Sequence, residues 1–168
     1  MATSKGRKQR RQTRPGPRRS PPYEFLDHPA DVGFRARGRS LRELFANAAR
    51  ALLDYGWDLK TVRARQRVTL RAAGHDRESL LYNWLSEILS RADAEGWAFK
   101  RVTVNRFNEE RETAEGQGTT YEVQGTARGE RFLRGRHRAR TYIKAVTYHQ
   151  LAVRKTRDAW RATVYLDV

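Results

Sequence analysis

The residues with the clearest potential for chemistry lie at the two ends of the folded part of the chain. Asp27 and Asp31 belong to the run LDHPADVG near the start, and Asp167 precedes the final residue, Val168, with its terminal carboxylate. Hard cations such as Ca2+ and Mg2+ prefer carboxylate and carbonyl oxygens to imidazole or thiolate ligands. If the fold brings the two ends together, these carboxylates can form a cation-binding site.

Each of these carboxylates also has a purely structural interpretation. Asp27 and Asp31 lie close to Pro29, and Asp near Pro is typical of turns, where its side chain accepts hydrogen bonds from backbone amides. Asp167 is equally compatible with a solvated chain end. The spacing of the residues therefore leaves a shared metal site and a set of ordinary surface carboxylates both open.

The residues favour a binding protein over an enzyme. Asp27, His28 and Asp31 include acid–base groups, but no Ser in a nucleophile elbow accompanies them. The four histidines have no short spacing typical of zinc ligands, and isolated histidines of this kind are expected to be structural. The chain contains no cysteine, which excludes disulfides, thiolate zinc sites and a cysteine nucleophile and fits a cytoplasmic protein.

Length and charge indicate one domain with a basic N-terminal tail. A chain of 168 residues that is 38% hydrophobic can bury one ordinary core. Residues 1–22 contain eight Lys or Arg and no acid, half of the net charge of +16, and they lack apolar residues to bury. We therefore expect a disordered tail over 1–22 and a domain over 23–168. The tail lacks the apolar centre of a signal peptide, and no segment has the composition of a membrane span.

Two amphipathic helices are predicted. Ser40 followed by Glu43 matches a capping box, and apolar residues then recur at helical spacing over about 41–54. Asp76 is a good N-cap for a second helix, which Gly96 ends. The apolar stripe of this second helix, expected in the core, comprises Leu80, Leu81, Trp84, Leu85, Ile88 and Leu89.

The remaining segments favour strands in an antiparallel arrangement. Strand character is found at 32–37, 68–72, 99–107, 121–127, 143–153 and 162–166. Alternation in the last segment places Asp167 on its polar face. The polar, glycine-containing stretch 108–119 predicts an exposed hairpin loop. Because strands outnumber helices and do not alternate with them, the predicted fold class is α+β, with mainly antiparallel sheets and two packed helices in a single compact domain.

A second predicted loop, 129–140, is rich in arginine and surrounds His137. This segment is interpreted either as a solvated basic surface or as a contact site for an anionic partner such as RNA. Its arginines are Arg131, Arg134, Arg136, Arg138 and Arg140.

Four separated blocks, taken in order, resemble the archease family. They are YEFLDHPADVG at 23–33, SLLYNWL at 79–85, KAVTYH at 144–149 and WRATVYLDV at 160–168. The resemblance spans 23–168 and leaves the basic tail outside. Archeases are small proteins that act with the RNA-splicing ligase, which joins a cyclic-phosphate end to a 5'-hydroxyl end in tRNA splicing and repair.

The resemblance implies a compact α+β domain that binds a divalent metal, often assigned as calcium. The implied ligands are Asp31, Asp167 and the carboxylate of Val168. Lys144 is the implied activating residue, thought to help the ligase form its covalent guanylate and turn over repeatedly, and we group Asp27 and His28 with it as partner-contact candidates. The family catalyses no known bond change, so the resemblance implies a non-catalytic activator.

Two positions depart from the family pattern. Pro29 replaces the usual Thr, which removes a hydroxyl and a backbone donor and pre-sets the turn. Tyr142 stands where an acidic residue is common, so a carboxylate that would support the metal or pair with Lys144 is missing. Either the metal is bound more weakly here, or Asp27 supplies the charge.

Three functions are compatible with these residues. The first is activation of the RNA ligase, which would depend on Asp31 and Lys144. The second is an RNA-binding adaptor, in which the basic tail 1–22 and the arginines of 131–140 grip RNA phosphates, so that binding depends on these residues and on salt concentration. The third is a chaperone-like modulator of a tRNA-modifying enzyme.

Overall fold

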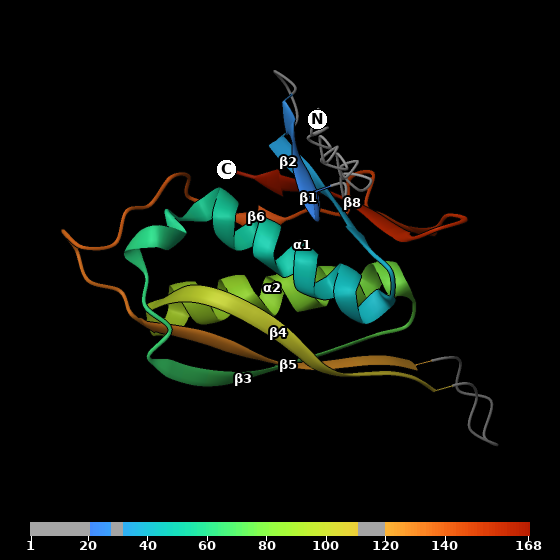
Figure 1. Ribbon diagram of the computed structural model, residues 1–168, viewed down its shortest axis with the longest axis horizontal. Coiled ribbons are helices and arrows are strands. Elements are labelled where there is room, and N and C mark those ends of the chain that lie inside the picture. Colours follow the sequence, from blue (N-terminus) through green and yellow to red (C-terminus); the bar gives the residue numbers. More distant parts are fainter. Residues whose placement is uncertain (1–20, 28–31, 111–119) are drawn as a thin grey trace, which may run out of the picture.

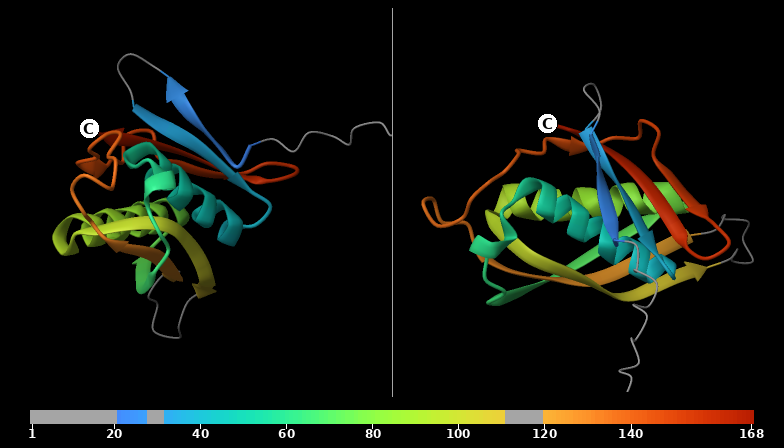
Figure 2. Two further views of the ribbon diagram at one scale, coloured as in Figure 1. Left: turned by 60° about the vertical axis from the view of Figure 1, so that its left-hand side comes forward. Right: turned by 45° about the horizontal axis from the view of Figure 1, so that its top comes forward.

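The structure is a computed structural model that describes residues 21–27, 32–110 and 120–168. Two antiparallel sheets enclose a layer formed by two helices (Figure 1). Figure 2 shows this arrangement from two further directions, with the helices between the sheets in each. The predicted class, α+β with mainly antiparallel sheets and two packed helices, is confirmed.

The first sheet has five strands and contains both segments that carry the candidate carboxylates. Its main path is β1-β2-β8-β6, and β7 also pairs with β8. The strands are β1 (Tyr23–Asp27), β2 (Val32–Gly38), β6 (Ala145–Val146), β7 (Ala152–Lys155) and β8 (Trp160–Asp167). The strand β8 is therefore central, with partners along both of its edges.

The second sheet has three long strands in the order β3-β5-β4. They are β3 (Gln66–Gly74), β4 (Trp97–Glu110) and β5 (Thr120–Arg131). Glu110 pairs with Thr120, so β4 and β5 form a hairpin as predicted, but residues 108–110 of the predicted loop belong to β4, where they pair with β5. The connection 111–119 lies outside the described residues. The helices are α1 (Leu41–Gly56) and α2 (Arg77–Glu95), and a 3-10 turn, η1, covers Leu59–Thr61.

The helices begin and end at the predicted residues. Ser40 Oγ accepts a hydrogen bond from the Glu43 amide at 3.1 Å at the start of α1. At the start of α2, Asp76 accepts from the Ser79 amide at 2.6 Å, and Ser79 Oγ accepts from the Asp76 amide at 3.1 Å. These bonds satisfy amides that lack a partner within the helix. Gly96, with φ of 64°, ends α2 in the left-handed conformation that glycine adopts without strain.

Trp84 connects the layers of the core. Its side chain is fully buried, and its Nε1 donates to the Phe45 carbonyl on α1 at 3.3 Å. On the other side it faces Gly125 of β5, where an added Cβ would lie only 2.6 Å from Trp84 Cη2 and 2.3 Å from the Thr103 carbonyl oxygen. A larger residue at Gly125 would therefore displace either the indole or the β4 backbone.

Three parts of the sequence interpretation needed correction. The segment 143–153 is not one strand but contains β6 and β7, separated by a turn in which Gln150 has φ of 48°. Residues 129–131 are not part of a loop, because Trp97 pairs with Arg131 and extends β5 to that point. The strand β1 was not predicted, yet it pairs along its length with β2.

Within the part of the chain that the structure describes, neither helix is long and apolar enough to cross a lipid bilayer.

Candidate functional site

Segments far apart in the sequence meet at one end of the five-stranded sheet. Val32, at the start of β2, pairs with Leu166 near the end of β8, and Ala145 of β6 pairs with Asp167. The Lys144 amide donates to the Asp167 carbonyl at 2.8 Å. The antiparallel register therefore places the start of β2, the start of β6 and the end of β8 beside one another.

Lys144 is the centre of the described site. Its Nζ donates to the main-chain carboxylate oxygen of Val168 at 3.0 Å and lies 4.0 Å from Asp167 Oδ1. The side chains of Lys144 and Asp167 are each 58% exposed. An ion pair in such high-dielectric surroundings adds little to folding stability. These charges are therefore available to a partner or an ion at little cost to the fold.

The structure brings together three of the predicted site residues: Lys144, Asp167 and Val168. His28 and Asp31 lie outside the described residues, so their parts in the site stay predictions. The Asp27 backbone pairs with Val32 at the same end of the sheet. In the sequence, Asp31 immediately precedes Val32.

The oxygen donors present suit a hard cation. Asp167 and the Val168 carboxylate approach the same ammonium group, so two negative groups already share one positive charge. Carboxylate oxygens are the ligands that Ca2+ prefers, although calcium takes 6–8 of them, including water. Among the residues that the structure describes, no three His, Cys, Asp or Glu side chains gather as a metal site. The metal ligands Asp31, Asp167 and Val168 therefore stay a prediction.

Tyr142, one of the two departures from the family pattern, lies on the surface beside this site. Its side chain is 65% exposed, and its hydroxyl lies 3.5 Å from Asp93 Oδ2 of α2. Tyr142 thus reaches a carboxylate on a neighbouring element instead of providing one of its own.

The arginines of 131–140 differ in their surroundings. Arg131 lies over the Trp97 ring, 4.4 Å from its centroid, and donates to the Glu95 carbonyl. Arg140 donates to the Asp54 carbonyl at 2.9 Å and to its carboxylate at 3.1 Å. These internal contacts, together with an ion pair of Arg136, show that the segment partly serves to fasten the loop after β5. A contact between RNA and Arg131, Arg134, Arg136, Arg138 or Arg140 stays a prediction.

A buried carboxylate network, which the sequence did not reveal, holds this loop. Glu130 accepts from the Arg63 amide at 2.8 Å and pairs with Arg136 at 2.5 Å. The Leu133 amide donates to His137 Nδ1 at 2.9 Å, so the proton is on Nε2, which donates to Glu130 Oε1 at 2.9 Å. His137 is therefore structural, as expected. Glu130 lies opposite Ala98 of β4, and only this long-range pairing shows that β5 continues to this point.

The acid stability of the protein should depend on this network. Burial by itself raises the Glu130 pKa, but hydrogen bonds from His137, the Arg63 amide and Arg136 outweigh it and lower the pKa from 4.5 to about 2. Because the folded pKa lies below the unfolded one, the stabilisation is complete above about pH 4.5 and is lost as the pH falls towards about 2.

The measurement is thermal melting of the parent and of Glu130→Gln between pH 7 and pH 2. We expect the variant to melt lower at neutral pH and the difference to shrink steadily below pH 4.5, where the carboxylate takes up a proton in the unfolded chain while it stays ionised in the folded protein down to about pH 2. A difference that stays constant over this range would mean that Glu130 keeps an ordinary pKa.

The structure defines a small α+β domain of two antiparallel sheets around two helices, with a cluster of two carboxylates and one ammonium at one end of the five-stranded sheet. Residues 23–168 match the Archease protein family (MTH1598/TM1083). The chain is 38% identical over 146 residues to Protein archease of Methanosarcina acetivorans, covering 87% of this chain and 95% of that one. Protein archease of Sulfurisphaera tokodaii is 34% identical, with 87% and 98% covered.

Solved structures have the same fold. The solution structure of Methanobacterium thermoautotrophicum protein 1598 superposes with a TM-score of 0.70 at 33% identity, covering 88% of this chain and 99% of that one. The crystal structure of an archease and possible chaperone from Thermotoga maritima gives a TM-score of 0.53 at 20% identity, covering 89% and 97%. This chain therefore belongs to the archease family, as the four sequence blocks indicated.

Proposed function

We propose that this protein is a non-catalytic activator of the RNA ligase of tRNA splicing and RNA repair, promoting guanylylation of the ligase and its multiple turnover. Family membership supports an accessory role. The observation that carries the proposal is the position of Lys144, whose ammonium is exposed and lies 3.0 Å from the Val168 carboxylate. An exposed ammonium at the rim of a small domain suits contact with the phosphates of an anionic ligase site.

The two departures from the family pattern are compatible with this role. Tyr142 stands where the family pattern usually has an acidic residue beside Lys144. Among the described residues, the Lys144 ammonium is therefore paired with the Asp167 and Val168 carboxylates alone. The net charge at this end of the sheet is thereby less negative than in the usual pattern. We expect weaker metal binding as a result, and Asp27 is the candidate to restore the charge.

The carboxylates of Asp31, Asp167 and Val168 are the groups that we propose to hold a divalent metal, and the metal that we propose is calcium. When bound, such an ion would supply positive charge at the rim of the domain. When no metal ion is bound, the Lys144 ammonium supplies positive charge at the same Asp167 and Val168 carboxylates. Lys144 and the metal therefore compete for the same oxygens.

Calcium binding is testable through this competition. Calcium should raise the melting temperature of the full chain, because a ligand specific for the folded state stabilises it by mass action. Lys144→Ala should enlarge the calcium-induced rise, since it removes the ammonium 3.0 Å from the Val168 oxygen. Asp31→Ala and Asp167→Asn should each abolish the rise. A calcium effect that is unchanged in Asp167→Asn would place the ion elsewhere, with Asp27 examined next.

The direct test of the proposed function uses the ligase from the same organism with GTP, a divalent ion and RNA that carries a cyclic-phosphate end and a 5'-hydroxyl end. The quantity measured is the number of joined products per ligase molecule. This protein should convert single-round joining into multiple turnover at less than one molecule per ligase. A ligase that turns over equally well without it would contradict the proposal.

A further inference from the structure

Three arginines lie directly opposite one another across the five-stranded sheet. Arg37 of β2 pairs in register with Arg161 of β8, and Arg161 pairs with Arg154 of β7. Opposed Cα atoms in antiparallel strands are about 5 Å apart, so the three Cα atoms span roughly 10 Å. We call these residues the arginine row.

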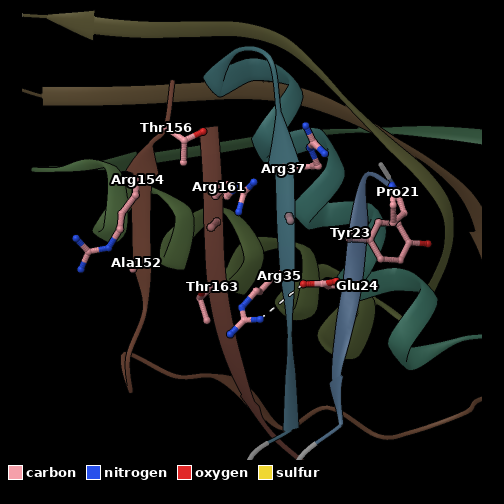
Figure 3. Close-up of a pocket in the computed structure, with 12 residues that line it drawn as sticks. Pro21, Tyr23, Glu24, Arg35, Arg37, Ala152, Arg154, Thr156, Arg161 and Thr163 are labelled. Carbon is pink, nitrogen blue, oxygen red and sulfur yellow. Dashed lines mark ion pairs between the residues drawn. The ribbon is translucent and has the colours of Figure 1, made fainter. Parts of the chain in front are cut away.

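The arginine row points away from the core. The neighbours on these strands, Ala36, Ala162 and Val153, are buried against the helices. Because side chains alternate between the two faces of a strand, the arginines lie on the outer face, where Arg154 and Arg161 are exposed. Figure 3 shows the row across three strands, with the helices behind the sheet.

The row lines a cavity of about 450 Å3 on this outer face. Arg35 and Thr163 line it as well, and they pair with each other two positions along the strands, as the next pair on the same face. Thr163 provides a hydroxyl that can donate to an anion. The cavity is therefore concave, open to solvent and lined by four guanidinium groups.

Charge in the cavity is poorly balanced. Among the described residues that line it, the one carboxylate is that of Glu24, which lies 3.7 Å from Arg35 and leaves the arginine row unneutralised. Within residues 21–27, 32–110 and 120–168, no ion pair of Arg37, Arg154 or Arg161 is found. Like charges directly opposite each other destabilise a sheet. A polyanion bound here would remove that repulsion.

The position of the cavity also fits a polyanion longer than a single phosphate. Arg161, Thr163, Tyr165 and Asp167 share the outer face of β8, so this face continues from the arginine row to the candidate site. At about 3.3 Å per residue, Arg161 and Asp167 are roughly 20 Å apart along the strand.

We infer that the arginine row binds the phosphodiester backbone of RNA. Guanidinium groups match phosphate oxygens in pairs, and several of them in one plane favour a chain of phosphates. Among the described lining residues, Tyr23 is the only aromatic one, and its hydroxyl donates to Asp54 at 3.0 Å. Without an array of aromatic rings on which bases can stack, binding is independent of sequence. This inference goes beyond ligase activation and does not depend on it.

The test is the affinity of the full chain for a fluorescent single-stranded RNA of mixed sequence, measured without ligase at several salt concentrations. Arg37→Gln, Arg154→Gln and Arg161→Gln are combined in one variant. Each lost phosphate contact lowers the salt slope by about 0.7, so we expect a decrease of about 2 and an affinity loss of about tenfold or more at ~0.1 M salt.

A matched control exists on the opposite face of the molecule. Arg67, Arg128 and Arg101 form a similar row across β3, β5 and β4 of the three-stranded sheet. Replacing these three with Gln removes the same charge and should change RNA affinity less than threefold. An equal loss in both variants would show that RNA responds only to net charge and would overturn the inference.

Three further results test the inference. Unchanged RNA binding in the arginine-row variant would overturn the inference. If that variant instead bound the ligase more weakly, the cavity would be a contact for an acidic protein surface. An unaltered or raised melting temperature, together with the expected loss of RNA binding, would support it, because the three arginines repel one another and add nothing to the core.

Discussion

Lys144→Ala should lose most of the stimulation of RNA joining while remaining folded. The ammonium is exposed and makes few internal contacts, so the fold loses little when it is removed. At the ligase surface, truncating one partner of a desolvated charge pair typically costs about 2–5 kcal/mol, which is more than tenfold in affinity. Asp31→Ala should have a comparable effect. The measurement is multiple-turnover joining at a fixed, substoichiometric concentration of the protein.

Lys60→Ala is the matched control for this prediction. It removes the same charge from η1, away from the end of the sheet that holds Lys144, and should stimulate joining like the parent. If Lys144→Ala also stimulates fully, the proposed role of Lys144 is wrong, although membership in the archease family is unaffected. Because RNA binding by the arginine row is measured without ligase, failure of one proposal does not imply failure of the other.

Trp84→Ala should cause the largest loss of stability. Its indole is fully buried between α1 and β5, and the cavity left by truncating such a residue typically costs about 3–5 kcal/mol. Gly125 cannot refill the space, since it has no side chain. The measurement is the midpoint of urea unfolding, at an unchanged slope, compared with the parent.

Tyr82→Ala is a control on the same helix. The Tyr82 ring stacks on Tyr148 with centroids 4.0 Å apart. Because Tyr148 is 57% exposed, folding buries less apolar surface at this contact than at Trp84. We expect a clearly smaller shift than for Trp84→Ala. Equal shifts would mean that Trp84 packs no better than a surface ring.

The helices and most strands were predictable because their signals are local. Ser40 and Asp76 cap the helices through hydrogen bonds to residues three positions away, and Gly96 ends α2 by its own conformation. Alternation in 162–166 correctly placed Asp167 on the polar face. Such patterns depend on a few neighbouring residues, so they can be recognised in the sequence without knowledge of the tertiary structure.

The errors occurred where distant residues decide the structure. Glu130 looks like a loop residue until His137 and the Arg63 amide supply its hydrogen bonds in the interior. The turn at Gln150 interrupts an apolar stretch whose composition favours one continuous strand. The arginine row was missed because the three residues come from β2, β7 and β8, and only the register makes them neighbours.

The candidate site could be predicted from the sequence only in part. The sequence contains carboxylates at both ends of the folded part, and the pairing of Val32 with Leu166 brings those carboxylates to one end of the five-stranded sheet. The closeness of Lys144 to the Val168 oxygen depends on the pairing of β6 with β8, which no local pattern specifies. The proposed contribution of Asp31 rests on the resemblance and awaits the calcium measurement.

The central position of β8 has an entropic consequence. Because β2 lies along one edge and β6 and β7 along the other, the backbone that carries Arg161 and Asp167 is fixed by hydrogen bonds before any partner arrives. Ordering a loop or side chain on association subtracts from affinity, and a preorganised surface avoids much of that loss. On binding a partner, only the side chains of the outer face would lose conformational freedom, because the backbone is already ordered. Fast, reversible association is therefore compatible with specific binding.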